Sequence, residues 1–211
     1  MQLLSKVLLQ PNRALKLLYP KAVWNVKTDE KNLYLTFDDG PIPVLTEWVL
    51  DVLKQYNVKA TFFCVGNNIE KHPHVFKRIQ REGHLVANHT FNHVKGFKTK
   101  TADYLENTAQ CEELTKTKIF RPPYGQLKRP QYKKLLEHGY KIVMWDVISY
   151  DYEKISPEQC FLNVKKNVKK GSVILFHDNV KAEKNIKYTL PLTIEYFLKL
   201  NYNFASLSHL K

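Results

Sequence analysis

Cysteine is scarce in this chain, and its spacing excludes the two kinds of site that cysteine-rich proteins build. Cys64, Cys111 and Cys160 are the three cysteines in 211 residues, they lie far apart, and no CxxC pair occurs. An odd number at wide spacing fits neither a disulfide framework nor a thiolate zinc site. Cys64 lies within an apolar run, so we expect it to be a small buried hydrophobic residue. This pattern favours a reducing compartment.

Long apolar segments are absent too, and no stretch approaches the roughly 20 residues that a transmembrane helix needs. The N-terminal sequence MQLLSKVLLQPNRALKLLYP is interrupted by charged residues and proline, and it lacks the apolar core and cleavage site of a signal peptide. We expect residues 1–30 to form a lead segment that packs on the domain, with its leucines on an amphipathic helix. A helix lying on a membrane surface is the alternative. A cytoplasmic location is favoured over export.

Acidic residues are few relative to basic ones. The chain has 33 Lys and Arg but 20 Asp and Glu, which gives a formal net charge of +13. Such a surplus attracts anions, so nucleic acid, anionic glycans and acidic membrane surfaces are candidate partners. The basic residues are scattered, however, with no Arg-rich arm and no basic stripe interleaved with aromatics. We therefore expect a solvated basic surface and no nucleic-acid binding, and the charge points weakly to an anionic glycan.

No low-complexity linker and no internal repeat divides the chain, so we expect one domain over residues 31–211. Short β-rich runs alternate with longer amphipathic stretches. Strands are expected at 33–37, 60–65, 85–88, 119–121, 141–146, 172–176 and 203–207. Helices are expected near 44–56, 69–81, 101–116, 129–138, 157–169 and 188–200. This alternation predicts an α/β fold with a parallel sheet.

The expected strand count fits two architectures, a distorted or reduced barrel and an open doubly wound sheet. A full eightfold barrel typically needs about 250 residues, more than this chain has. Unusual polar residues follow several of the expected strands directly. Because barrel enzymes build their sites at the carboxyl ends of the strands, this placement favours the barrel.

Two of these polar clusters together supply a set of metal ligands. Asp38 and Asp39 of TFDDGP close an apolar strand, where adjacent carboxylates are costly without compensating charge. Successive strand residues point to opposite faces, so one Asp could bind a cation while the other contacts a different group. A polar turn is the alternative. His89 and His93 of HTFNH are spaced as two ligands of one zinc ion. Three protein ligands leave positions open, as in catalytic metal sites.

Two further clusters could supply groups for proton transfer and oxyanion binding. In RPPYG, the prolines make the chain rigid after Arg121, whose guanidinium could be held against a carboxylate, and the amide of Tyr124 is available to an oxyanion. A simple Pro-Gly turn is the alternative reading. In ILFHD, His177 follows an apolar strand. It is either a structural histidine or, near a metal, a candidate general acid.

The motifs TFDDGP, GHLVANHTFNH, RPPYG, WDVISYDY and LFHD occur in one order along the chain. In that order they resemble the five motifs of the NodB-type polysaccharide deacetylases, family four of the carbohydrate esterases. The resemblance extends from about Leu33 to Leu207. It implies a distorted (β/α)7 barrel and a metal-dependent hydrolase. Such an enzyme removes acetyl groups from N-acetylated sugars of a glycan such as chitin, peptidoglycan or an exopolysaccharide.

The resemblance also implies which residues hold the metal and take up the proton of water. Asp39, His89 and His93 would bind a divalent cation, Zn²⁺ ahead of Co²⁺, Ni²⁺ or Mn²⁺, since imidazole and carboxylate ligands suit several metals. Asp38 would act as the general base, with Arg121 as its charge partner.

The remaining motif residues would complete the reaction and bind the substrate. By the resemblance, His177 is the general acid, and Asp151 orients it and raises its pKa. Tyr124 would donate its backbone N–H to the oxyanion. Leu175 and Tyr152 would line a small pocket for the acetyl methyl group.

Two positions depart from the family's usual pattern. Tyr152 stands where the family often has Trp, and Ile148 where it often has a further Asp. The first change alters the shape of an aromatic wall and adds a hydroxyl, while the second leaves Asp151 in place. The alternatives to the N-deacetylase are an O-acetyl esterase, an amidase acting on a non-sugar substrate, and a non-catalytic module that binds glycan or nucleic acid.

Overall fold

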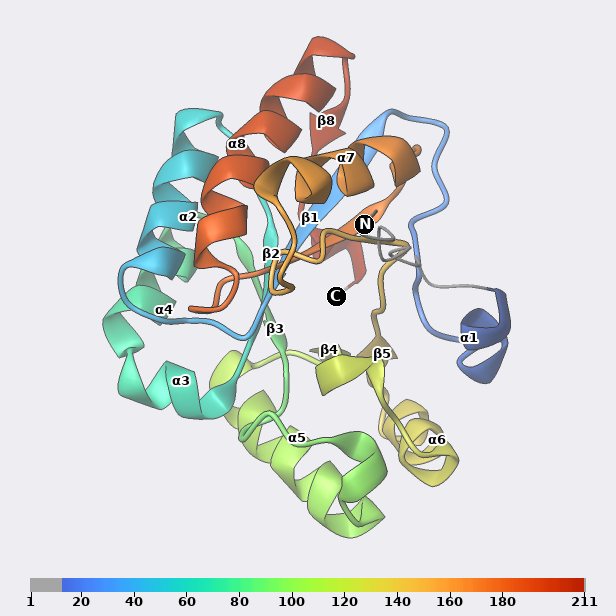
Figure 1. Ribbon diagram of the computed structural model, residues 1–211. Coiled ribbons are helices and arrows are strands. Elements are labelled where there is room, and N and C mark those ends of the chain that lie inside the picture. Colours follow the sequence, from blue (N-terminus) through green and yellow to red (C-terminus); the bar gives the residue numbers. More distant parts are fainter. Residues whose placement is uncertain (1–12, 211) are drawn as a thin grey trace, which may run out of the picture.

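The computed structural model describes residues 13–210, with side chains from residue 16 onward. Its centre is a curled half-barrel of parallel strands wrapped by helices (Figure 1). In spatial order the strands are β5 (Lys141–Ile142), β4 (Ile119–Phe120), β3 (Leu85–Asn88), β2 (Thr61–Cys64), β1 (Asn32–Asp38), β7 (Val173–His177) and β6 (Val147–Ile148). A short strand β8 (Asn203–Phe204) pairs with the start of β1. The predicted distorted seven-stranded barrel is therefore confirmed, and the open doubly wound sheet is not what forms.

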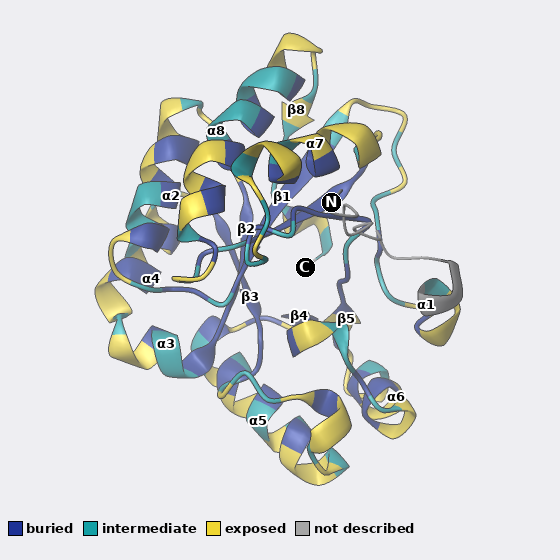
Figure 2. Ribbon diagram, viewed as in Figure 1, coloured by how far each residue is buried: buried dark blue, intermediate teal, exposed yellow. Residues whose placement is uncertain are grey.

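The helices lie outside the sheet (Figure 2). They are α1 (Arg13–Leu18), α2 (Leu45–Gln55), α3 (Gly66–Lys71), α4 (Pro73–Arg81), α5 (Thr101–Thr115), α6 (Arg129–Glu137), α7 (Pro157–Asn167) and α8 (Glu183–Lys199). From α2 onward each helix has buried residues on one side, whereas Leu17 and Leu18 of α1 are exposed. On α2, for example, Val49, Leu50 and Leu53 are fully buried against the β1–β2 core. Burial of each such side chain is worth about 1.5–3 kcal/mol, so the sheet and helices stabilise each other. No helix among residues 13–210 is both long and apolar enough to cross a bilayer.

Two helix predictions differ from the structure. The helix expected at 69–81 is two helices, α3 and α4, which meet at His72. His72 precedes Pro73, and the proline ring disfavours helical geometry in the residue before it, so the helix breaks there. The last long helix begins at Glu183 rather than 188 and continues through Pro191. Its polar first turn has no clear apolar periodicity, so the start of the helix was predicted too late in the sequence.

The predicted strand at 141–146 is also wrong, and the difference explains how the barrel opens. Ile142 pairs with β4, whereas Val147 pairs with β7, so β5 and β6 form the two edges of the sheet. The chain passes from one edge to the other through residues 143–146.

The segment that leads into the domain pairs with the residue after β5 and with the residue before β7. Val23 pairs with Val143, and Asn25 pairs with Ser172 just before β7. In the same segment, Tyr19 and Trp24 are buried in the cluster that contains the apolar face of α6. The N-terminal helix predicted from the leucine spacing falls largely on residues 1–12, outside the described residues.

The three cysteines are free and buried, Cys64 among them, as its apolar surroundings in the sequence predicted.

Candidate active site

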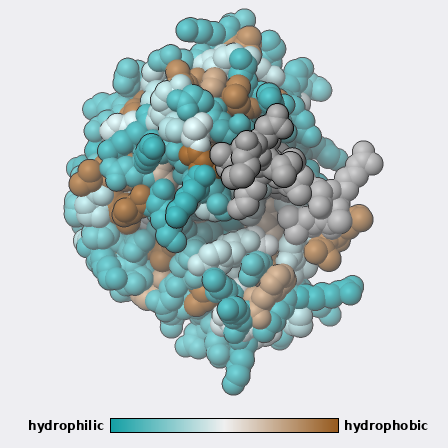
Figure 3. All heavy atoms as spheres, viewed as in Figure 1, coloured by the Kyte–Doolittle hydropathy of each residue, from teal (hydrophilic) through white to brown (hydrophobic). Residues whose placement is uncertain are grey.

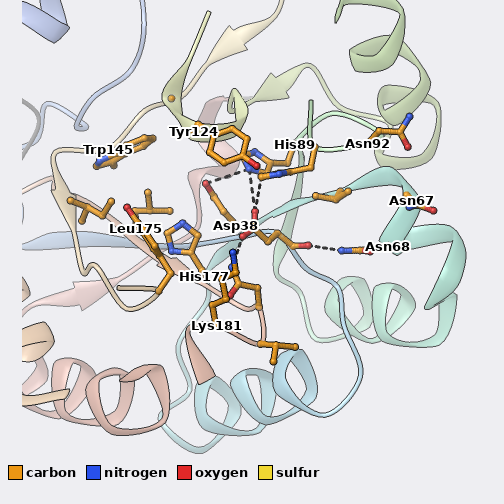
Figure 4. A pocket seen from close by; sticks show the side chains of 18 residues that line it. Asp38, Asn67, Asn68, His89, Asn92, Tyr124, Trp145, Leu175, His177 and Lys181 are labelled. Carbon is orange, nitrogen blue, oxygen red and sulfur yellow. Dashed lines mark hydrogen bonds and ion pairs between the residues drawn. The ribbon is translucent and has the colours of Figure 1, made fainter. Parts of the chain in front are cut away.

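Polar side chains from several strand ends line one cavity at the carboxyl edge of the sheet. Asp38 ends β1, His177 ends β7, and His89 follows β3 directly. Because these strands are parallel, their carboxyl ends meet, and they border an open cavity with a volume of about 610 Å³. In Figure 4 the side chains of Asp38, His89 and His177 converge, with Tyr124 and Trp145 on the same cavity wall. The sequence predicted this convergence from the position of the motifs.

Asp39, His89 and His93 lie close enough to share one cation. Their ligand atoms are all within 4.8 Å of one another, and Oδ1 of Asp39 lies 2.9 Å from Nε2 of His93 and 3.6 Å from Nε2 of His89. Nδ1 of His89 lies 2.8 Å from the carbonyl oxygen of Arg121. That contact holds the proton on Nδ1 and leaves the Nε2 lone pair facing Asp39, the arrangement typical of metal-binding histidines.

Electrostatics at this ligand set favour an ionised carboxylate. Burial opposes the charge of Asp39, but the adjacent His89 and His93 and the nearby His177 outweigh it, and the pKa of the carboxyl is held well below its usual range. One carboxylate oxygen and two imidazole nitrogens suit zinc and several other divalent cations. The donor set therefore fits a catalytic metal.

Both aspartates of TFDDGP face the same cavity, which corrects the expectation that they point to opposite faces. The strand alternation ends at Asp38, because Asp39 has a φ of +86°. In that left-handed conformation the chain turns, and the Asp39 carboxylate comes back to the side of Asp38. Oδ2 of Asp38 lies 3.8 Å from Nε2 of His89, next to the candidate ligands.

Asp38 forms a buried ion pair with Arg121. Nη1 of Arg121 donates to Oδ1 of Asp38 at 2.7 Å and to the Thr36 hydroxyl at 2.8 Å. Its Nε and Nη2 donate to the carbonyl oxygens of Val143 and Met144 at 3.2 and 2.8 Å. Burial lowers the pKa of the fully buried guanidinium, and Asp38 counteracts that effect. The backbone contacts hold the guanidinium in place, so one oxygen of Asp38 is occupied and the other faces the cavity.

His177 is held by two hydrogen bonds to Asp151. Its Nδ1 lies 2.8 Å from Oδ1, and its backbone N–H donates to Oδ2 at 2.7 Å. Burial alone would lower the pKa of His177, but the fully buried Asp151 carboxylate raises it by more, to about 9. The imidazole is thus protonated at neutral pH. Because Nδ1 is occupied, Nε2 is the nitrogen that can deliver a proton.

The predicted substrate-contacting residues also lie around this cavity. Tyr124 has a φ of +60° and a half-exposed ring 4.8 Å from that of His93. The Tyr152 ring meets His177 edge-on at 4.7 Å, and Leu175 and Ile148 form buried apolar lining.

Sequence reasoning missed several residues that shape the cavity. Trp145 packs on Gly125, where a Cβ would lie 2.8 Å from the indole, so only glycine permits this approach. The side-chain amide of Asn68 donates to the carbonyl oxygen of Asp39 at 2.7 Å, and that of Asn179 donates to Oδ2 of Asp39 at 2.5 Å. Asn179 follows the LFHD motif directly. Its position after a strand end was the signal that could have identified it.

Comparison with known proteins gives consistent matches over most of the chain. The family model described as polysaccharide deacetylase matches residues 25–143. A peptidoglycan-N-acetylglucosamine deacetylase of Bacillus cereus is 33% identical over 194 residues, covering 89% of this chain and 91% of the relative. A second relative from that organism with the same name is 42% identical over 149 residues, 68% of this chain. That match spans only 54% of the relative's own length.

A solved structure shows the same fold. The crystal structure of a peptidoglycan N-acetylglucosamine deacetylase superposes with a TM-score of 0.85 at 34% sequence identity. The superposition covers 90% of this chain and 92% of the other. The curled barrel is therefore common to both chains over nearly their whole length.

Proposed function

Because the chain belongs to the polysaccharide deacetylase family, we propose that it hydrolyses the acetamide groups of N-acetylated sugars in a glycan, releasing acetate and leaving an amine. The observation that carries this proposal is the arrangement around one cavity of a three-residue metal-ligand set, an ion-paired aspartate and a protonated histidine. Each of the three groups matches one requirement of amide hydrolysis. Zn²⁺ is the cation we propose.

Asp39, His89 and His93 would hold the cation, which when bound polarises the acetyl carbonyl and makes water more acidic. Asp38 is the base that accepts the proton of the attacking water through Oδ2, since Oδ1 is bound to Arg121. Arg121 forms an ion pair with Asp38 beside the second carboxylate and fixes the orientation of Asp38.

His177 supplies the proton that the leaving nitrogen needs. An amine departs poorly as an anion, so transfer of a proton from Nε2 as the C–N bond breaks makes the step feasible. Asp151 keeps this proton on the imidazole at neutral pH and orients the ring. The Tyr124 backbone N–H donates to the oxyanion, a contribution of about 3 kcal/mol when such a donor is well placed. Leu175 and Tyr152 enclose the acetyl methyl group.

We further propose that the glycan carries negative charge. Lys181 lines the cavity, and the ammonium group of Lys95 lies 4.9 Å from the centre of the Tyr124 ring at the same cavity. The lysine ion pairs in the described part of the chain involve Lys133, Lys169 and Lys187 instead. Hydrophilic side chains cover most of the face shown in Figure 3. Two unpaired cations near the reacting centre would favour a sugar or substituent bearing a carboxylate.

The reaction is tested by measuring acetate release from chitooligosaccharides and from acetylxylan, together with metal analysis of the purified protein. We expect acetate from the N-acetylated substrate, loss of activity on chelation, and recovery with Zn²⁺. Acetate from acetylxylan alone would make the protein an O-acetyl esterase. Bound metal without acetate from either glycan would indicate a binding module.

The charge preference is tested with carboxylate-bearing peptidoglycan glycan fragments against neutral chitooligosaccharides. Lys181→Gln and Lys95→Gln should raise KM for the charged substrate and leave the neutral one unaffected, while Lys77→Gln on the outer surface of α4 serves as the control. Added salt should weaken the preference, because it screens exposed charges. Equal KM changes for both substrates would refute an anion-binding role.

A further inference from the structure

The loops that follow β1 and β7 are joined by hydrogen bonds at Asp38 and Gly40, the residues on either side of the candidate metal ligand Asp39. The backbone N–H of Asp178 donates to the carbonyl oxygen of Asp38 at 3.1 Å, and that of Gly40 donates to Oδ1 of Asp178 at 3.0 Å. The Thr46 hydroxyl donates to the other Asp178 oxygen at 2.6 Å. Asp178 is fully buried, and a Cβ at Gly40 would lie 2.0 Å from its Oδ2. The two loops therefore have a fixed spacing.

Asn179, the next residue on the β7 loop, bonds to both its own loop and the Asp39 side chain. Its Oδ1 accepts the backbone N–H of Ala182 at 3.1 Å, next to the start of α8. Its Nδ2 donates to Oδ2 of Asp39 at 2.5 Å. Since a backbone N–H can only donate, the bond to Ala182 fixes which end of the amide is oxygen. The amide group that faces Asp39 must then be the donor.

This contact determines how the Asp39 carboxylate is presented. Oδ2 is occupied by Asn179, while Oδ1 lies 2.9 Å from Nε2 of His93 and 3.6 Å from Nε2 of His89. The carbonyl oxygen of Asp39 is bound by Asn68 of α3, so the backbone of Asp39 is held as well as its side chain. Rotation of the carboxylate would break the bond to Asn179.

We propose that Asn179 is a positioning residue for the metal site: it binds Oδ2 of Asp39 so that Oδ1 alone is presented to the cation. This inference rests on the metal-dependent function proposed above. A neutral amide suits the role because it donates a hydrogen bond without adding charge. A lysine there would neutralise Asp39 and weaken its attraction for a cation, and an aspartate would add a competing ligand.

The test separates this contact from the contact with α8. Asn179→Ser retains a hydroxyl that can accept the Ala182 N–H, as serine does at helix starts, but it is too short to reach Asp39. Asn179→Ala removes both contacts. Asn92→Ala is the matched control, because Asn92 lines the same cavity without a hydrogen bond to Asp39 among those the structure shows. Each holoprotein is loaded with Zn²⁺ or Co²⁺ and titrated with a chelator, and the Co²⁺ absorption spectrum and the Tm of the metal-free form are recorded.

We expect both Asn179 variants to lose metal affinity about 10–100-fold, as is usual when a residue that orients a metal ligand is removed. Their Co²⁺ spectra should change, while Asn92→Ala behaves as wild type. The Tm of the metal-free protein should fall for Asn179→Ala and not for Asn179→Ser. Wild-type metal retention and an unchanged spectrum in Asn179→Ser would overturn the inference. Failure of the wild-type protein to bind metal would instead refute the proposed function.

Discussion

Replacing Asp151 with Asn should move the alkaline limit of the pH–activity profile to lower pH. The pKa of His177 is raised from 6.5 to about 9, mainly by Asp151 and to a smaller extent by Asp39 and Asp38. The substitution keeps the size of the side chain but removes the largest of these charges. In the variant burial still lowers the pKa of His177 while Asp39 and Asp38 still raise it, so we expect a pKa near the ordinary value of about 6.5. A bound cation lowers the pKa of His177 in the wild type and in the variant alike. The quantity to compare is therefore the difference in the His177 pKa between the two proteins.

The size of the effect follows from the fraction of His177 that is protonated. For pKa values of about 9 and 6.5, that fraction at pH 8 falls from about 90% to about 3%, a roughly 30-fold loss of the acid form. At pH 5.5 both proteins are almost fully protonated. The ratio of wild-type to variant kcat should therefore grow about 30-fold between pH 5.5 and pH 8, beyond any constant loss from misorientation of the ring.

The assay is acetate release from an N-acetylated oligosaccharide at a series of pH values, with Asp29→Asn on the surface as the control. p-Nitrophenyl acetate gives a second check, because its leaving group needs no proton and its hydrolysis should be less affected. A wild-type to variant ratio that stays constant from pH 5.5 to pH 8 would refute the assignment of His177 as the acid controlled by Asp151. So would equal losses on both substrates.

The ion pair between His177 and Asp151 should also stabilise the metal-free protein in a pH-dependent way. A folded-state pKa of about 9 against 6.5 in the unfolded chain stabilises the fold by up to about 3 kcal/mol. The sign follows from the raised pKa: this contribution is complete below pH 6.5 and is lost as the pH rises through 9. Thermal unfolding between pH 6 and pH 10 should show that loss in the wild type and not in Asp151→Asn.

Three other substitutions test the rest of the site. Asp38→Asn should lower kcat by about 10²–10⁴-fold, the range for loss of a general base, with unchanged metal content by elemental analysis; normal turnover would show that the base lies elsewhere. Arg121→Lys should lower the free energy of unfolding by about 3–5 kcal/mol, because lysine cannot keep the four hydrogen bonds of the buried guanidinium. Chemical denaturation measures this loss, and an unchanged free energy of unfolding would contradict the reasoning. Gly40→Ala should lower Tm because its Cβ would lie 2.0 Å from Oδ2 of Asp178, and an unchanged Tm would show that the two loops can move apart.

The regular part of the fold could be predicted because each element carries its own signal. Apolar residues at helical spacing on α2 and the apolar runs of β1, β2 and β7 have periodicities set by local geometry, which sequence alone contains. The strands β5 and β6 were harder to predict. Their residues lie in one mostly apolar stretch that is interrupted by Asp146, and only the pairing partners, β4 for one strand and β7 for the other, decide where the two strands lie.

The parts of the site in which polar residues follow strands could be predicted from the sequence. The parts in which a residue of one loop positions a residue of another loop by a hydrogen bond could not. The motifs placed Asp38, Asp39 and His177 at strand ends, and parallel pairing brings such ends together. The positive φ of Asp39 did not follow from the strand pattern, which placed its side chain on the wrong face. The bond from Asn179 to Asp39 links residues 140 positions apart, and no local spacing encodes such a contact.

The segment at Val23 bears on how the chain can be shortened. The Val23 carbonyl oxygen accepts the N–H of Met144, and the Val23 N–H donates to the carbonyl oxygen of Ile142. Val23 therefore holds the residues that follow β5. The carbonyl oxygens of two of them, Val143 and Met144, bind Arg121. Trimming the protein to begin at β1 would leave every motif residue intact and yet free those carbonyls to move. Such a truncation would disable the base Asp38 by loosening its partner Arg121, whose anchoring carbonyls at Val143 and Met144 lie 111 and 112 residues after the start of β1.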